Sequence, residues 1–231
     1  MSSWKLTKRR GAPRAVLWDL DGTLVDSGDY HWRAWRDTMH GEGLDLTYEQ
    51  FLASFGQKND AILTAWMGSA ATPDVIRRIG DAKESLYRQL AAHEGLVSLP
   101  GAADWVARLH EGGWLQAIAS SAPAENVRVM LDALNLDRYF DAFVTAEDVT
   151  AGKPDPQVFL AAAAKLQMPP DACVVVEDAA AGVGAARRAG MKCVGVSRSS
   201  VLAADVYVES LTELPADTFE RLTGARLTAD S

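Results

Sequence analysis

Six short apolar runs constrain the fold of this chain more than any other feature of its sequence. They are rich in aliphatic residues, and most are separated by segments with the period of an α-helix. The runs lie at residues 14–19, 115–120, 142–145, 173–177, 192–196 and 205–208. Such an alternation predicts an α/β fold, with a Rossmann-like, doubly wound parallel sheet that has helices on both faces.

The stretch between the first two runs departs from this pattern. Over residues 28–95 four amphipathic segments follow one another without a convincing strand. Thr47 with Gln50 three residues on has the form of a capping box, and Thr72 before a proline marks a second helix start. Because this stretch leaves the sheet just after a strand and returns before the next, we expect it to lie over the carboxyl ends of the strands, where ligands bind.

These patterns predict the domain organisation. We expect an inserted all-helical cap and a Rossmann-like catalytic core made of two segments, with short tails at both ends. The expected ranges are 28–96 for the cap, 12–27 and 97–220 for the core, and 1–11 and 221–231 for the tails.

The composition narrows the classes of partner. The chain has 231 residues, 48% of them hydrophobic, and a formal net charge of −8, which argues against a nucleic-acid duplex or an anionic membrane as the main partner. Cys173 and Cys193 lie in apolar runs without a metal-ligand pattern, so we expect buried thiols in a reducing compartment. The basic segment 5–10 lacks a following uninterrupted apolar stretch, so we expect a tail rather than a signal peptide, and a cytoplasmic monomer.

Two aspartates, Asp19 and Asp21, end the first apolar run, and Gly22 follows them. Alternate side chains of an extended strand point the same way, so both carboxylates can meet at the strand's carboxyl end and hold a hard cation. A turn at Asp21 and Gly22, with Asp19 as a cap, explains the same residues equally well.

Three later signals lie at or just after the ends of other strands. Ser120 and Ser121 precede a helix start, where hydroxyl and N–H groups can bind phosphate, although a serine there is usually only an N-cap. Lys153 is held in a loop between a glycine and a proline, where a surface lysine is the alternative. Glu177 and Asp178 end a fully apolar run, and adjacent acids there favour metal binding over simple capping.

The order of these motifs resembles the haloacid dehalogenase-like hydrolase superfamily over almost the whole chain. DLDGTLVDS resembles its first motif, IASS its second, GKPDP its third and VVVEDAAAG its fourth. The helical insertion and the stretch YHWRAW at residues 30–35 are similar to the β-phosphoglucomutase-like group, which includes phosphomonoester phosphatases as well as the mutase.

The resemblance implies a mechanism and a metal. Asp19 would attack phosphorus and form an aspartyl-phosphate, and Asp21 would act as general acid and then general base, for which it needs a raised pKa or a poised neutral state. A Mg²⁺ ion would be held by Asp19, the backbone carbonyl of Asp21, Asp178, and Glu177 directly or through water. The phosphate oxygens would be held by Ser120, Ser121 and Lys153.

The resemblance also suggests cap residues that contact the substrate. His31 matches a histidine near the catalytic acid of the mutase, with a helix residue packed by Tyr30 and Trp32 as the alternative. Lys83 matches a phosphate-binding lysine if Tyr87 sets the register, but its charged surroundings favour a solvated side chain.

A mutase must bind a second phosphate, and the family does so with a cap arginine and with polar residues after the second motif. Here Lys58 and Asn59 surround the arginine position, where Lys58 would supply some charge, and residues 122–124 read Ala-Pro-Ala. We therefore favour a phosphatase acting on a small phosphomonoester, such as a sugar phosphate, over a sugar phosphomutase.

Other classes fit less well. Asp21 counts against a dehalogenase or a phosphonate-cleaving enzyme of the superfamily. A phospho-receiver domain places its acidic pair before the phosphoacceptor strand and has no helical insertion. A non-catalytic interaction module would not need Asp19. Arg187 replaces the third glycine of a dinucleotide loop in AGVGAAR, which argues against a nicotinamide or flavin.

Overall fold

The computed structural model describes residues 14–224 and contains a six-stranded sheet in the order β3-β2-β1-β4-β5-β6. Every neighbouring pair of strands is parallel. The strands are β1 (Ala15–Trp18), β2 (Leu115–Ala119), β3 (Ala142–Val144), β4 (Cys173–Glu177), β5 (Lys192–Val196) and β6 (Val206–Val208). The six predicted strands and the parallel α/β fold are thus confirmed, and the first strand lies at the centre of the sheet.

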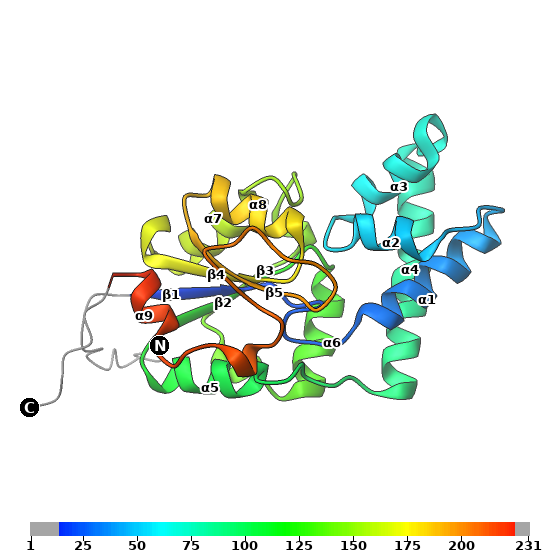
Figure 1. Ribbon diagram of the computed structural model, residues 1–231. Coiled ribbons are helices and arrows are strands. Elements are labelled where there is room, and N and C mark those ends of the chain that lie inside the picture. The colour runs from blue at the N-terminus through cyan, green and yellow to red at the C-terminus, as the bar shows by residue number, and fades with distance from the viewer. Residues whose placement is uncertain (1–13, 225–231) are drawn as a thin grey trace, which may run out of the picture.

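Helices cover both faces of this sheet (Figure 1). One face of β1 presents Val16 and Trp18 to a core that includes side chains of α5, α6 and α9, whereas Ala15 and Leu17 face a core formed with α7 and α8. The helices of this part are α5 (Ala102–Glu111), α6 (Ala124–Leu134), α7 (Gln157–Lys165), α8 (Ala180–Arg188) and α9 (Thr218–Leu222). Short 3₁₀ helices span Gly68–Ala70, Asp137–Tyr139, Ala146–Asp148, Pro170–Ala172 and Leu211–Glu213.

The insertion between β1 and β2 is helical, as predicted. It contains α1 (Gly28–Gly41), α2 (Tyr48–Ser54), α3 (Asn59–Met67) and α4 (Pro73–Glu94). The capping box expected at Thr47 forms, because its hydroxyl accepts from the Gln50 amide while the Gln50 side chain accepts from the Thr47 amide. Thr72 likewise caps α4, with a proline in the first turn.

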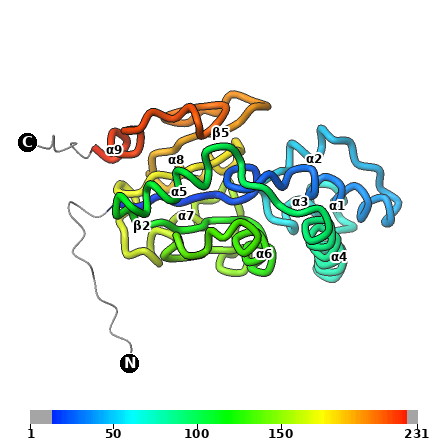
Figure 2. The backbone as a smooth tube through the Cα atoms, turned by 90° about the horizontal axis from the view of Figure 1, so that it is seen from below, coloured from blue at the N-terminus to red at the C-terminus, as the bar shows by residue number. Residues whose placement is uncertain are grey.

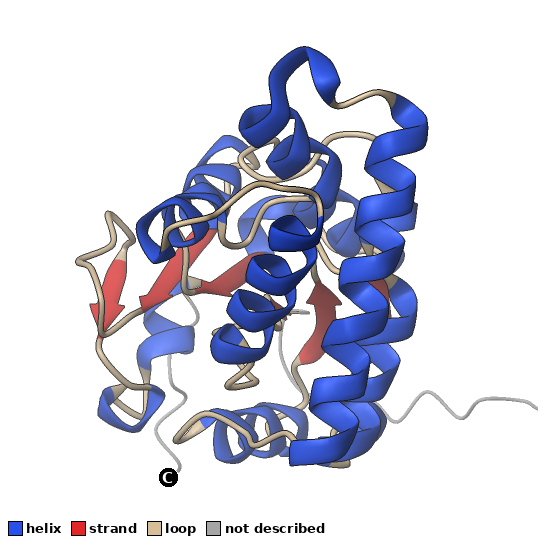
Figure 3. Cartoon of the chain, turned by 90° about the vertical axis from the view of Figure 1, so that its right-hand side faces the viewer, coloured by secondary structure: helices blue, strands red, loops and turns tan. Residues whose placement is uncertain are grey.

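The four helices of the insertion share a small apolar core and lie together at one end of the sheet. Their core is built on Trp35, Met39, Phe51, Ile62, Leu63 and Ile79. Two perpendicular views place them beyond the carboxyl ends of the strands (Figures 1 and 2), and from that side they lie in front of the sheet (Figure 3). The outgoing and returning connections lie side by side, since Leu99 donates to the carbonyl of Leu24 at 2.9 Å.

The predicted tails lie almost entirely outside the described residues, apart from residues 221–224, of which 221 and 222 belong to α9. We propose the boundaries 28–96 for the cap domain on the basis of where α1 begins and α4 ends. Cys173 and Cys193 are free and buried, as predicted. In the described part of the chain no helix has the length and apolar character needed to cross a membrane.

Candidate active site

The first motif places Asp19 directly after β1, between the neighbouring strands β2 and β4. The Asp19 amide donates to the carbonyl of Val176 in β4 at 3.0 Å, and the Asp19 side chain is buried. The chain then turns at Gly22, whose φ is +77°. A Cβ at this position would lie 2.1 Å from Oδ2 of Asp178, so only glycine lets the first motif pack against the fourth.

Three carboxylates of the first and fourth motifs converge at this point. One oxygen each from Asp19, Glu177 and Asp178 lies within 4.8 Å of the others. They meet because β1 and β4 pair side by side, with Trp18 opposite Val176. Burial raises the pKa of Asp178 well above its usual value, and repulsion by Glu177 and Asp19 raises it further.

This cluster fits a hard divalent cation. Oδ1 of Asp178 is buried and has no hydrogen-bond partner among the described residues. A buried carboxylate oxygen without a donor is costly, and a metal ion would satisfy it. All the available ligand atoms are oxygens, as magnesium and calcium require. Glu177 is already engaged on both oxygens, by Lys153 at 2.8 Å and by the Ala179 amide at 2.7 Å.

Lys153, from the third motif, joins the same cluster. Its ammonium donates to Oδ1 of Asp19 and to Oε1 of Glu177, and its side chain is fully buried. Burial alone would lower the pKa of Lys153, but attraction by Asp19 and Glu177 outweighs burial and raises it, so the lysine is charged. Burial raises the pKa of Asp19 to about 8 despite the opposing effect of Lys153.

The second motif follows β2 and lies beside the first. Ser120 is buried, and its hydroxyl accepts from the Ala122 amide at 3.0 Å. Ser121 lines the same pocket as Asp19 and Asp21. Since β2 pairs with β1, the structure brings together the residues that the sequence selected as phosphate ligands and the nucleophile.

Asp21 is held by the helical insertion. Its Oδ1 accepts from the Ser27 hydroxyl at 2.6 Å and lies 2.8 Å from Nε2 of His31. Burial alone would raise the pKa of Asp21, but the hydrogen bonds from His31 and Ser27 and the charge of Lys83 lower it below its usual value. We expected a raised pKa or a poised neutral state from the general-acid role, and the lowered pKa is neither; of the two donors, Ser27 closes the first motif and His31 lies on α1.

His31 connects Asp21 to Lys83. Its ring stacks on Tyr87 with centroids 4.1 Å apart, and Nδ1 lies 2.9 Å from the Lys83 ammonium. An ammonium can only donate, so Nδ1 must accept and Nε2 must carry the proton that it shares with Asp21. The predicted packing partners of His31, Tyr30 and Trp32, are replaced in the structure by Tyr87 and Phe55.

The prediction that Lys83 is solvated was wrong. Lys83 is only 2% exposed, because Glu84 accepts from its ammonium at 2.8 Å. The carboxylate of Glu84 also accepts from Asn59 at 2.7 Å and from Asn126 of α6 at 2.6 Å. Sequence reasoning assigned no function to Glu84 or Asn126. The helical period offered a signal for α4, since Ile79 and Tyr87 are buried and the helix face that joins them includes positions 83 and 84.

Lys58 does not take the place expected of a substrate ligand. Its ammonium donates to the carbonyls of Ala146 at 2.9 Å and Val149 at 2.8 Å, both in the loop after β3. Lys58 therefore fastens the insertion to the core, whereas Asn59, its neighbour, lines the pocket.

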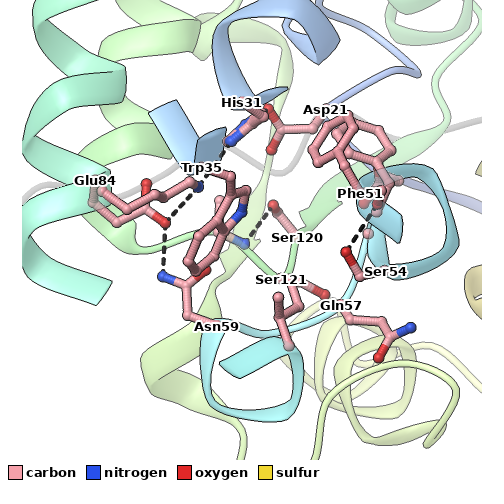
Figure 4. A pocket seen from close by; sticks show the side chains of 16 residues that line it. Asp21, His31, Trp35, Phe51, Ser54, Gln57, Asn59, Glu84, Ser120 and Ser121 are labelled. Carbon is pink, nitrogen blue, oxygen red and sulfur yellow. Dashed lines mark hydrogen bonds and ion pairs between the residues drawn. The ribbon is translucent and has the colours of Figure 1, made fainter. Parts of the chain in front are cut away.

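The pocket lies between the sheet and the insertion (Figure 4). It encloses about 40 Å³, which is room for only a few water molecules. Figure 4 shows Glu84 bonded to Asn59 on one side and Asp21 beside His31 on another. The core contributes acids and serines from the first two motifs, and the insertion contributes Trp35, Phe51, Phe55, Asn59, Ile62, Lys83 and Glu84.

Comparisons with known proteins agree with this architecture. Hexitol phosphatase B of Escherichia coli (strain K12) is 32% identical over 214 residues, which cover 87% of this chain and 94% of the relative. Protein SUPPRESSOR OF QUENCHING 1, chloroplastic, of Arabidopsis thaliana is 36% identical over 192 residues, or 80% of this chain, but the chain spans 18% of that protein. The crystal structure of β-phosphoglucomutase from Clostridium difficile has a TM-score of 0.83 at 25% identity, covering 92% of this chain and 98% of that one.

The family assignment follows from a match to most of the chain. The sequence model of the haloacid dehalogenase-like hydrolase family matches residues 13–190, a range that contains all four motifs. The chain belongs to the haloacid dehalogenase-like hydrolase family.

Proposed function

We propose that this protein is a magnesium-dependent phosphatase that hydrolyses a small phosphomonoester through an aspartyl-phosphate on Asp19. The observation that carries the proposal is the convergence of Asp19 with Lys153, Glu177 and Asp178 beside a pocket that the insertion closes. The name of hexitol phosphatase B, a relative that this chain matches over nearly its whole length, supports the assignment.

The first step transfers the phosphoryl group to the enzyme. A carboxylate oxygen of Asp19 forms a bond to phosphorus, and the bond from phosphorus to the ester oxygen breaks. Asp21 gives its proton to that leaving oxygen, so an alcohol departs. Lys153 keeps one oxygen of Asp19 in place, while Ser120, Ser121 and the adjacent amides hold the phosphoryl oxygens.

The second step returns the enzyme to its starting state. Asp21 takes a proton from a water molecule as the water oxygen attacks phosphorus, and the bond to Asp19 breaks, which releases phosphate. The lowered pKa of Asp21 makes the protonated form needed in the first step a minor fraction at neutral pH, whereas the carboxylate needed here as the base is the form left after that step. A magnesium ion held by Asp19, the Asp21 carbonyl and Asp178, with Glu177 direct or through water, would supply charge that offsets the repulsion between carboxylate and phosphate.

A mutase is the alternative in the same family, and the pocket counts against it. A mutase must hold a second phosphate, which calls for positive charge in the insertion. Lys58 is turned toward core carbonyls, and Lys83 is shared between His31 and Glu84. The geometry therefore favours transfer to water.

The test is phosphate release from a panel of phosphorylated metabolites, with and without magnesium. We expect magnesium-dependent turnover, and we expect Asp19→Asn to abolish it while the circular dichroism spectrum stays unchanged. Glucose 1-phosphate should be hydrolysed or ignored. Efficient formation of glucose 6-phosphate, even with a bisphosphate activator, would show a mutase, and turnover by Asp19→Asn or by chelator-treated enzyme would contradict the mechanism. Binding of a partner without any turnover would indicate an interaction module.

A further inference from the structure

Glu84 is a buried acid in the wall of the substrate pocket. It lies on α4 of the insertion, is 5% exposed and lines the pocket together with Asp19 and Ser120. A line of close contacts joins Glu84 to Asp21, the proposed general acid and base. Asp21 contacts His31 at 2.8 Å, His31 contacts Lys83 at 2.9 Å, and Lys83 contacts Glu84 at 2.8 Å.

Its neighbours fix the position and the charge of this carboxylate. Asn59 from α3 and Asn126 from α6 each donate an amide hydrogen to it, one to each oxygen. Burial alone would raise the pKa of Glu84, but attraction by Lys83, with the hydrogen bonds from Lys83 and Asn59, lowers it below its usual value. Glu84 is therefore an anion that cannot easily turn away from the pocket.

The basic side chains near Glu84 already have hydrogen-bond partners within the protein. Lys83 and His31 are the basic side chains among the pocket-lining residues of the described chain, and both take part in the line of contacts from Asp21 to Glu84. A second phosphate brought to this wall would meet an anion rather than a free cation. A hydroxyl group would meet an acceptor with capacity left, since within residues 14–224 Oε2 of Glu84 accepts one hydrogen bond, from Asn126, and a carboxylate oxygen can accept two.

We propose that Glu84 is a specificity-determining residue, which accepts hydrogen bonds from hydroxyls of the leaving group and rejects substrates that carry a second phosphate. The inference rests on the proposed phosphatase function and names its substrate class. The substrate is a monophosphate of a sugar or polyol, and sugar bisphosphates are excluded. Juxtaposed like charges and unpaired buried polar groups both discriminate strongly between similar ligands.

The test compares esters that differ by one phosphate. Values of kcat/KM are measured for glucose 6-phosphate against glucose 1,6-bisphosphate, and for fructose 6-phosphate against fructose 1,6-bisphosphate. For whichever monophosphate is the better substrate, we expect the wild-type kcat/KM to exceed that of the corresponding bisphosphate by about 100-fold or more, as like-charge repulsion in a desolvated site allows. Equal values for the wild-type enzyme would overturn the proposal, and this measurement does not depend on a variant that folds.

The variant Glu84→Gln removes the charge and keeps the shape. We expect its preference for the monophosphate to fall by about 10-fold or more, mainly because KM for the bisphosphate falls once the like charge is removed. Asp81→Asn is the matched control, since Asp81 is exposed on the same helix, and it should keep the wild-type ratio. An unchanged ratio in Glu84→Gln, with a folded protein by thermal unfolding, would contradict the role of Glu84.

The substrate 4-nitrophenyl phosphate separates the two proposals, because it carries neither hydroxyls nor a second phosphate. Suppose that the enzyme hydrolyses 4-nitrophenyl phosphate with magnesium but has equal kcat/KM for monophosphates and bisphosphates. The phosphatase function then stands, and the role of Glu84 is overturned. The same result follows if neither monophosphate is hydrolysed while 4-nitrophenyl phosphate is. Failure to hydrolyse any of these esters would overturn both proposals.

Discussion

The carboxylate of Glu177 occupies the space that a side chain at position 182 would need. A Cβ on Gly182 would lie 1.7 Å from Oε1 of Glu177. This is a severe steric clash, which the helix or the carboxylate could relieve only by moving, at a cost in stability. Gly182 lies on α8, which begins three residues after Glu177. The first turn of α8, which contains the last residues of the fourth motif, therefore sets the position of a proposed metal ligand.

Gly182→Ala should displace Glu177 from Lys153 and from the acidic cluster. We expect the magnesium concentration for half-maximal activity to rise at least about 10-fold, and the free energy of unfolding to fall by about 1–3 kcal/mol from overpacking. Gly184→Ala is the control on the same helix, because its Cβ would meet the flexible end of Arg188 at 3.2 Å and Cβ of Pro154 at 3.7 Å, an ordinary van der Waals contact. Wild-type magnesium dependence in Gly182→Ala would show that Glu177 does not help to hold the ion.

Magnesium and protons should compete for the acidic cluster. The pKa of Asp19 is raised to about 8 by burial in the metal-free protein, so below that pH the group holds a proton that magnesium must displace. Magnesium affinity should therefore increase as the pH rises from 6 to 8. Isothermal titration calorimetry in two buffers with different ionisation enthalpies would measure the released protons, and an affinity independent of pH would refute the expectation.

Removing the ring nitrogens of His31 should change the pH profile. His31 lowers the pKa of Asp21, so His31→Phe should raise that pKa and move the alkaline limb of kcat/KM, which reports Asp21 as the acid of the first step, to higher pH. We also expect kcat to fall about 10–100-fold, as for loss of a group that supports acid–base catalysis. His40→Phe on the same helix changes an exposed histidine and should leave the profile in place; an identical shift in both variants would exclude a specific role for His31.

Lys58→Met should weaken the attachment of the insertion to the core. Two hydrogen bonds to core carbonyls are lost, and each bond from a charged donor contributes about 1.5–3 kcal/mol. We expect KM to rise about 10-fold with kcat within about 2-fold. Lys192→Met is the control, because it removes a lysine that pairs with Asp205 on the surface. The measurement is steady-state kinetics of both variants, and equal KM values would count against an attachment by Lys58.

The sequence was sufficient to predict the sheet, the helical insertion and the convergence of the four motifs. Strand ends in a parallel sheet meet at one edge, so Asp19, Ser120 and Glu177 could be brought together from their positions alone. The environment of the insertion's charged residues could not be predicted in this way. Lys83 is buried because Glu84 neutralises it, and Glu84 is held by Asn126, which is 42 residues away.

Two further differences have the same physical origin. Lys58 is engaged by backbone carbonyls, which any sequence provides and no motif marks. The pKa of Asp21 is lowered by hydrogen bonds from Ser27 and His31, which lie six and ten residues further along the chain and whose side-chain directions the motif alone does not specify. Patterns in the sequence identify acids and bases well, but the partner that decides their charge is often distant.

The central position of β1 also sets the order in which the proposed site is completed. Asp19 directly follows β1, Lys153 comes 134 residues later, and β4 must pair with β1 before Glu177 and Asp178 reach the site. A chain that ends between Lys153 and β4 would contain the lysine that pairs with Asp19 but not the two proposed metal ligands. Fragments without β4 should therefore lack the proposed phosphatase activity.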